Sequence, residues 1–407
     1  MKKLLFTSSI ILSVNLIIAQ VNPAGELDPR FSRIEKGIKS ADLDFLSKSD
    51  FNFTNIKVNP STAVKNQQQT GTCWAFSTTS LVESQAIKNN VGNTDLSEMF
   101  TVRNIYIEKA KNYILRQGHA QFSQGGLGHD LIRSIANYGA MPEEAYRGLP
   151  GNAKSYNHEL LFADLKKYVD SVIDAMGKNV TVSKNGTIND WLKGYNDILN
   201  KYMGAAPEKF LYKFKPYTPQ TFAKNFLRFN SDDYINITSF THHPFYKPFI
   251  VEVPDNFSNG AYYNLPINEM IESVELALNK GYTVLWDADV SNDGFNQKIG
   301  LALNLSTDSR NIFNKMNPDA TESVVDEKTR QKFFENLVTQ DDHLMHIVGI
   351  EKSKEGKTFF IVKNSWGESA GPYKGYIHVS ESYFALNTIS LVVPKAALNK
   401  ALLDKLN

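Results

Sequence analysis

Hydrophobic positions recur at helical spacing over much of the first two-thirds of the chain. After Cys73, the residues Trp74, Ser77 and Leu81 fall on one face of a helix, so a helix is expected to begin at or next to Cys73. The same spacing predicts further helices over residues 102–115, 127–138, 159–176, 187–203, 218–229 and 266–279. The middle of the chain is therefore expected to be helical and to form an insertion.

The pattern changes after Phe249. Short β-rich runs with glycine turns occupy residues 282–290, 343–350, 358–367, 375–380 and 389–394. Helices first and strands later indicate an α+β protein of two lobes. We expect a signal peptide (1–19), an amino-terminal arm (20–60), a helical lobe (61–150), a helical insertion (151–250), a β-rich lobe (251–397) and a tail (398–407).

The amino terminus resembles an export signal. Lys2 and Lys3 precede a mostly apolar stretch from Leu4 to Ile18, and small Ala19 follows. This stretch is too short and too polar for a membrane span, so we expect cleavage near Ala19 and a periplasmic or secreted protein. The 44 Lys and Arg against 43 Asp and Glu give no basic field for nucleic acid or for a membrane surface, and neither partner is predicted.

Cys73 is the single cysteine among 407 residues, so no intramolecular disulfide is possible. An isolated cysteine is most often a small buried hydrophobic residue. A nucleophilic cysteine needs its thiolate stabilised, for which a helix amino end and a histidine are the usual means. The expected helix start supplies the first of these, and the histidine should in turn be oriented by an amide or a carboxylate.

Three separated segments together resemble the papain-like cysteine peptidases: "NQQQTGTCWAF", "DHLMHIVGI" and "VKNSWG". The resemblance implies a two-lobed papain-like α+β fold, with a helical lobe, a β-barrel-like lobe and a large helical insertion. It implies catalytic roles for Cys73, His343 and Asn364 and an oxyanion role for Gln67. It also implies substrate contacts for Gly125 and Gly126, and a Trp366 that covers the contact between Asn364 and His343.

The 270 residues from Cys73 to His343 exceed the spacing of simple papain relatives. That insertion, with "TPQTFAKNFL" and "VLWDADVSNDGFN", is similar to the bleomycin hydrolase and aminopeptidase C branch. The branch implies an aminopeptidase, a carboxyl-terminal arm in the cleft and a homo-hexamer that acts on peptide substrates. A papain-like endopeptidase, an acyl transferase and a catalytically silent peptide-binding protein remain alternatives. No metal or organic cofactor is expected.

Four histidines that lie outside the implied catalytic triad have expected roles of their own. His346 lies three residues after His343, so on a strand the two side chains point to opposite faces and cannot share one role. In the family that the chain resembles, the catalytic histidine precedes a strand glycine by six positions, which implies His343 before Gly349 as the base; His346 remains an alternative. His242 and His243 form a pair with no spaced carboxylate or thiol, which favours a loop over a metal site. A structural role is expected for His129.

Overall fold

The computed structural model describes residues 51–177, 190–306 and 316–406. These residues belong to one compact unit, Asp42–Asn407, and the other unit, Met1–Ala41, lies outside them. The predicted signal peptide and most of the predicted arm therefore fall outside the described residues. No helix among the described residues is both long and apolar enough to cross a membrane.

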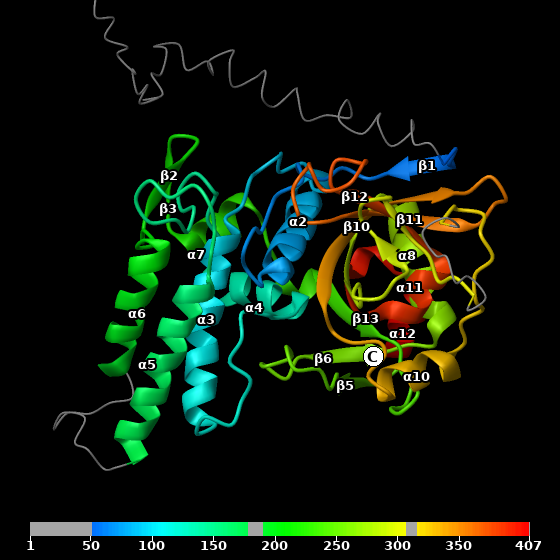
Figure 1. The fold of residues 1–407 in the computed structure, drawn as a ribbon. Helices are drawn as coiled ribbons and strands as arrows, with labels where there is room; N and C mark the ends of the chain where they lie inside the picture. The colour runs from blue at the N-terminus through cyan, green and yellow to red at the C-terminus, as the bar shows by residue number, and fades with distance from the viewer. Residues whose placement is uncertain (1–50, 178–189, 307–315, 407) are drawn as a thin grey trace, which may run out of the picture. The chain divides into compact units, whose positions relative to one another are not determined.

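Helices dominate the first half of the chain, and the described strands other than β1 lie in the second half together with the remaining helices (Figure 1). The described helices are α2 (Cys73–Lys88), α3 (Glu98–Leu115), α4 (Gly128–Tyr138), α5 (Glu159–Gly177), α6 (Asp190–Met203), α7 (Pro219–Thr221), α8 (Ile267–Asn279), α10 (Glu327–Glu335), α11 (Glu381–Asn387) and α12 (Lys400–Leu406). Short 3-10 or π turns cover Phe222–Phe226, Ser231–Asp233 and Lys395–Ala397. The helix starts predicted at Cys73, Leu127 and Pro266 agree with these bounds to within one residue.

Eleven strands form one large sheet, in the order β5-β6-β4-β13-β7-β10-β11-β12-β9-β8, with β1 paired to β10. They are β1 (Thr54–Val58), β4 (Tyr234–Thr238), β5 (Pro248–Ile250), β6 (Ala261–Asn264), β7 (Val284–Ala288), β8 (Phe295–Asn296), β9 (Leu301–Ala302), β10 (His343–Lys352), β11 (Thr358–Lys363), β12 (Tyr376–Ser380) and β13 (Thr388–Pro394). A separate hairpin pairs β2 (Phe210–Tyr212) with β3 (Lys215–Tyr217).

Part of the predicted helical insertion belongs to this sheet. Within residues 151–250, helices α5 and α6 follow the prediction, but β4 pairs with β13 through Ile237 and Leu391, and β5 pairs with β6. Strand pairing between residues so far apart in sequence leaves no local signal. The helical part of the insertion therefore ends before residue 231.

Strand β10 links the two lobes. Its first half pairs with β7 and its second half with β1, and a bulge near Gly349 accompanies the change of partner. A side chain at Gly349 would meet the Lys57 carbonyl oxygen at 2.6 Å, so the close approach of β1 requires glycine there. Helix α2 packs on β10, which brings the start of one lobe's central helix to the first strand residue, His343.

Two cores hold these layers. One joins α2 to α6 and extends to Leu285, Leu344 and Val392 of the sheet. At the seam, Gly128 of α4 lies directly against Leu285 and Val392, where a Cβ would clash with both side chains. The other core lies between the sheet and helices α8, α11 and α12.

The carboxyl-terminal helix α12 is part of the second core. Leu402 and Leu406 are buried in it, and Lys405 pairs with Glu269 of α8 at 2.9 Å. The Lys280 ammonium also donates to the carbonyl oxygens of Ala397 and Leu398. The tail through Leu406 is thus held against α8, whereas the family resemblance had implied an arm in the cleft.

Candidate active site

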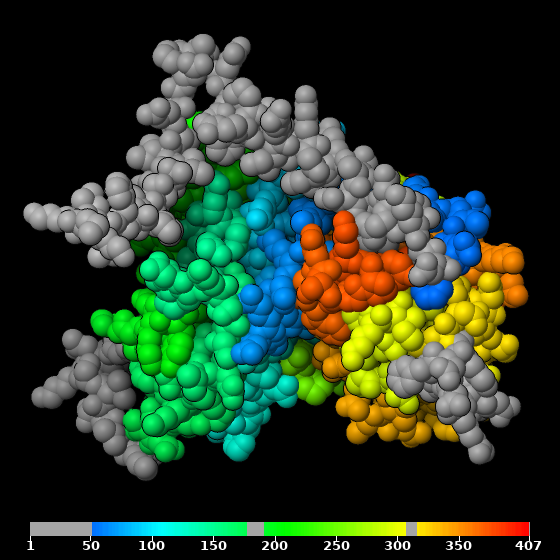
Figure 2. All heavy atoms as spheres, turned by 45° about the horizontal axis from the view of Figure 1, so that its top comes forward, coloured from blue at the N-terminus to red at the C-terminus, as the bar shows by residue number. Residues whose placement is uncertain are grey.

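Cys73 is the first residue of α2, in the segment that runs between the two lobes. Two backbone interactions attach the loop before it to the β lobe. The Gln67 N–H donates to the Ser365 carbonyl at 2.9 Å, and Asn66 forms an isolated antiparallel β-bridge with Trp366. In Figure 2 the part of the chain that includes α2 (blue) lies between the helical residues (green) and the carboxyl-terminal residues (orange). The sulfur accepts a backbone hydrogen bond from Leu344, the residue after His343. Cys73 is 8% exposed.

His343 and Asn364 form the hydrogen bond that the sequence predicts. His343 Nε2 lies 2.8 Å from Asn364 Oδ1, and the same oxygen accepts the Ser365 backbone N–H at 2.7 Å. A backbone N–H can only donate, so Oδ1 is correctly placed as the acceptor and His343 Nε2 must carry its proton. This leaves Nδ1 of His343 as the nitrogen that can accept a proton.

Two groups hold this pair in place. The Trp366 ring lies over the His343 ring, with 4.8 Å between centroids and 33° between planes. Asn364 Nδ2 donates to Gln297 Oε1 at 3.0 Å, an interaction that the sequence did not suggest. Because both His343 and Asn364 are buried, their hydrogen bond is shielded from competing water.

The electrostatics of the sulfur differ from the sequence expectation of a stabilised thiolate. The pKa of Cys73 is raised to about 12, mainly by burial; the Leu344 hydrogen bond opposes this rise, and the charges of Asp287, Asp341 and Asp255 contribute to it. Burial also lowers the pKa of His343, although Asn364 and Asp342 oppose this. The two shifts in pKa therefore favour a neutral thiol at Cys73 and a neutral imidazole at His343.

Gln67 lies within this site, and Ser365 fixes its amide. Ser365 Oγ donates to Gln67 Oε1 at 2.6 Å, and Gln67 Nε2 donates to the Thr70 carbonyl at 2.7 Å. An amide nitrogen has two N–H groups, so one of them remains to bind a ligand. Sequence reasoning missed Ser365, although it stands between Asn364 and Trp366 in "NSWG".

Gly125 and Gly126 lie beside the start of α2. The Trp74 ring lies 3.1 Å from where a Cβ of Gly126 would stand, and the Trp74 indole N–H donates to the Gln124 carbonyl at 3.0 Å. The space beside Gly125 is filled by the carboxylate of Asp255. Neither glycine could carry a side chain without displacing these groups.

The two histidines of β10 face different partners. His346 Nδ1 lies 2.8 Å from Ser80 Oγ of α2, in a fully buried setting that lowers its pKa well below the usual value. Its hydrogen-bond partner is therefore a hydroxyl of α2, whereas His343 is the histidine that meets the orienting amide of Asn364. His129 bonds to Tyr262 and Ser258 at 2.7 and 2.8 Å, in keeping with a structural role.

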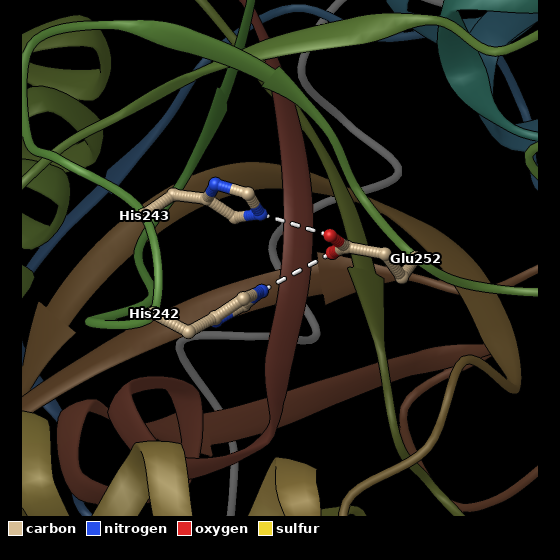
Figure 3. Close-up of side chains that lie close together, drawn as sticks. All are labelled: His242, His243 and Glu252. Carbon is tan, nitrogen blue, oxygen red and sulfur yellow. Dashed lines mark hydrogen bonds and ion pairs between the residues drawn. The ribbon is translucent and has the colours of Figure 1, made fainter.

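The structure gives the pair His242 and His243 a carboxylate partner that the sequence did not indicate. Figure 3 shows Glu252 between the two rings, with Nε2 of His242 at 3.1 Å and Nε2 of His243 at 2.8 Å from its oxygens. The three ligand atoms lie within 4.8 Å of one another, close enough to share a metal ion.

The tautomer of His242 opposes metal binding at this cluster. Gln331 Oε1 accepts the Thr241 backbone N–H, so Gln331 Nε2 is the group that donates to His242 Nδ1 at 2.9 Å. His242 then carries its proton on Nε2, the atom that a metal would need unprotonated. As arranged, the cluster is a hydrogen-bonded link between the loop at residue 242 and the segment at residue 252.

Comparisons with known proteins fit this geometry. A profile of the Peptidase C1-like family matches residues 32–407. Aminopeptidase W of Lactobacillus delbrueckii subsp. lactis is 24% identical over 382 residues, which cover 84% of this chain and 83% of that protein. Aminopeptidase C of Listeria monocytogenes is 24% identical over 414 residues, with 92% and 90% covered. The crystal structure of PepW from Lactobacillus rhamnosis superposes with a TM-score of 0.65 at 20% identity and covers 94% of this chain and 95% of that chain.

Proposed function

This chain belongs to the Peptidase C1-like family, and from that membership we propose that it is a cysteine aminopeptidase acting through Cys73, His343 and Asn364. The predicted α+β fold of the papain-like peptidases is confirmed by the likeness to PepW. The family and the aminopeptidase names of the relatives support a cysteine-type enzyme. The assignment of roles to single residues is our proposal.

The proposed reaction begins with proton transfer. His343 Nδ1 takes the proton of the Cys73 thiol, while Asn364 Oδ1 accepts from Nε2–H and stabilises the imidazolium. The thiolate then attacks the carbonyl carbon of the first peptide bond. His343 returns the proton to the leaving amine, and a water activated by His343 hydrolyses the acyl-thioester.

Two donors would stabilise the oxyanion. The backbone N–H of Cys73, at the first position of α2, has no acceptor within the helix. The free N–H of Gln67 Nε2 is the second donor, held in orientation by Ser365. Such preorganised donors contribute most where water is excluded, as in this buried site.

One observation carries the proposal: the only cysteine stands at a helix start and accepts a hydrogen bond from the backbone of Leu344, the residue after a histidine whose tautomer is fixed by Asn364. We expect purified protein to release aminomethylcoumarin from alanyl-aminomethylcoumarin, and the Cys73→Ala variant to be inactive. Hydrolysis that survives in Cys73→Ala would refute the mechanism. Activity on amino-blocked peptides alone would favour the endopeptidase alternative, and binding without turnover the silent peptide-binding protein.

We also propose that the enzyme is exported. The pattern of Lys2, Lys3 and the apolar stretch ending at Ala19 supports a cleaved signal. Mass spectrometry of the mature protein should find an amino terminus near Gln20, and an intact Met1 in the native host would contradict export.

A further inference from the structure

Three carboxylates from separate parts of the chain act on the sulfur of Cys73 through their charge. Asp287 lies on β7, Asp341 lies two residues before His343, and Asp255 lies in the segment between β5 and β6. The charge of each one acts on Cys73, and each one also acts on at least one of the others. A concentration of negative charge beside a cysteine nucleophile opposes its ionisation, so this arrangement calls for an explanation other than thiol activation.

Asp287 has an oxygen without a partner. Its side chain is 1% exposed, and Oδ2 accepts from Ser390 Oγ at 3.0 Å. Its Oδ1 is buried and meets no hydrogen-bond donor in the part of the chain that the structure describes. Asp341 lies beside it, but two carboxylates can hydrogen bond to each other only by sharing a proton. A buried acceptor left in this state is costly unless a ligand supplies a donor.

The protein itself supplies no ion pair to these carboxylates. Within residues 51–177, 190–306 and 316–406, no Lys or Arg lies within salt-bridge distance of Asp255, Asp287 or Asp341. Lys109 is the nearby buried cation, yet its ammonium donates to the backbone carbonyls of Ser123 and Gly125. Asp255 instead accepts from the neutral side chains of Gln121 and Ser123, each at 3.1 Å.

We propose that Asp255, Asp287 and Asp341 together bind the free α-ammonium group of the peptide whose first residue is removed. This assignment rests on the proposed aminopeptidase function and deepens it. The α-nitrogen and the attacked carbonyl carbon are joined through one Cα and lie about 2.5 Å apart. A group that binds the α-ammonium must therefore lie near the nucleophile; the charges of these carboxylates act on Cys73, and Asp287 pairs across the sheet with Leu344, whose backbone bonds to the sulfur.

The position of Asp255 agrees with this role. The Asp255 carboxylate fills the space beside Gly125, on the segment that the family resemblance assigns to substrate contact. Asp255 and Asp341 are half-buried, whereas Asp287 is fully buried. A bound ammonium would give Asp287 Oδ1 its missing donor.

Substrate binding would then favour the active state of Cys73. The carboxylates contribute to the raised pKa of the thiol, and burial with mutual repulsion also raises the pKa of Asp287 and brings that of Asp341 to about 7. An ammonium among them removes the repulsion felt by a thiolate. A peptide with a blocked amine binds without this compensation, so selection for a free amino terminus acts on the rate of the chemical step as well as on binding.

A primary ammonium can come from two sources, and the experiment separates them. One is the α-amine of the residue to be removed, which we propose. The other is a lysine side chain at the preceding position of a blocked peptide. The substrates are alanyl-, acetyl-alanyl-, acetyl-lysyl-alanyl- and acetyl-leucyl-alanyl-aminomethylcoumarin, tested on wild type and on Asp255→Asn, Asp287→Asn and Asp341→Asn.

We expect wild type to prefer alanyl-aminomethylcoumarin, and each Asp→Asn variant to lose about 10- to 100-fold in kcat/KM on that substrate, the range of a charge-assisted hydrogen bond. Asp293→Asn, which removes an exposed carboxylate of the same lobe, is the matched control and should equal wild type. The rate of Cys73 alkylation by iodoacetamide, which carries no charge, should rise in the cluster variants because repulsion of the thiolate decreases.

Two results would overturn the assignment: an unchanged preference for the free amine in the variants, or a preference of wild type for the acetyl-lysyl over the free-amine substrate. Absence of any hydrolysis by wild type would instead overturn the proposed function itself. If Asp287→Asn fails to fold, the half-buried Asp255 and Asp341 carry the same test.

Discussion

Replacing Ser365 with alanine should weaken catalysis through Gln67. Ser365 Oγ is the donor to Gln67 Oε1 at 2.6 Å, and Gln67 is 8% exposed, so no bulk water replaces the lost bond. Without the Ser365 hydroxyl, the Gln67 amide can rotate so that its oxygen, and not an N–H group, points at the developing oxyanion. A neutral hydrogen bond contributes about 0.5–1.5 kcal/mol, which corresponds to about a 2- to 13-fold lower kcat.

The assay is a double-mutant cycle on alanyl-aminomethylcoumarin. Gln67→Ala removes the oxyanion donor and should lower kcat by about 100- to 1000-fold. If Ser365 acts only by orienting Gln67, then Ser365→Ala should have no further effect in the Gln67→Ala background. The control Ser171→Ala, whose exposed hydroxyl bonds within α5, should behave as wild type. Independent, multiplicative losses from the two substitutions would refute this role of Ser365.

Three further predictions concern other parts of the molecule. Asn364→Ala should lower kcat by up to about 100-fold with little change in KM, because His343 loses the acceptor that fixes its tautomer; an unchanged kcat would contradict this. Burial lowers the pKa of His158 to about 4, so its neutral form stabilises the fold above pH 6.5, and that stability is lost as the pH falls from 6.5 towards 4. Relative to His158→Asn, wild type should lose about 1.4 kcal/mol of unfolding free energy per pH unit in that range in urea titrations, and a constant difference would refute the linkage. Added zinc or EDTA should leave the Tm unchanged, since His242 offers a protonated Nε2; a zinc-dependent rise in Tm that His243→Ala removes would show a metal site instead.

Much of the site was predictable because its residues lie in short local patterns. The helix start at Cys73 follows from the apolar spacing after it, and the strands at 343–350 and 358–363 from their runs of β-branched and aromatic residues. His343 begins the first of these strands and Asn364 directly follows the second, and the pairing of the two strands brings their side chains within hydrogen-bond distance.

The carboxylate cluster was not predictable in this way. Asp255, Asp287 and Asp341 lie on three segments that only the tertiary fold brings together. The one local signal was Asp287 itself, an acid inside the apolar run "VLWDA" with every position buried. Glu252 beside His242 and His243 was missed for the same reason, since the intervening turn gives no pattern that pairs them.

Gly128, at the seam between the lobes, limits how this enzyme can change shape. With only a hydrogen atom between the α4 backbone and the side chains of Leu285 and Val392, the two halves interlock without spare volume. A hinge motion that separates the two halves would have to disrupt this packing, whereas rotations of surface side chains would not. Adaptation to different peptides should therefore come from side-chain rotations at the protein surface. The relative positions of Cys73 and His343 should stay the same from one peptide to the next.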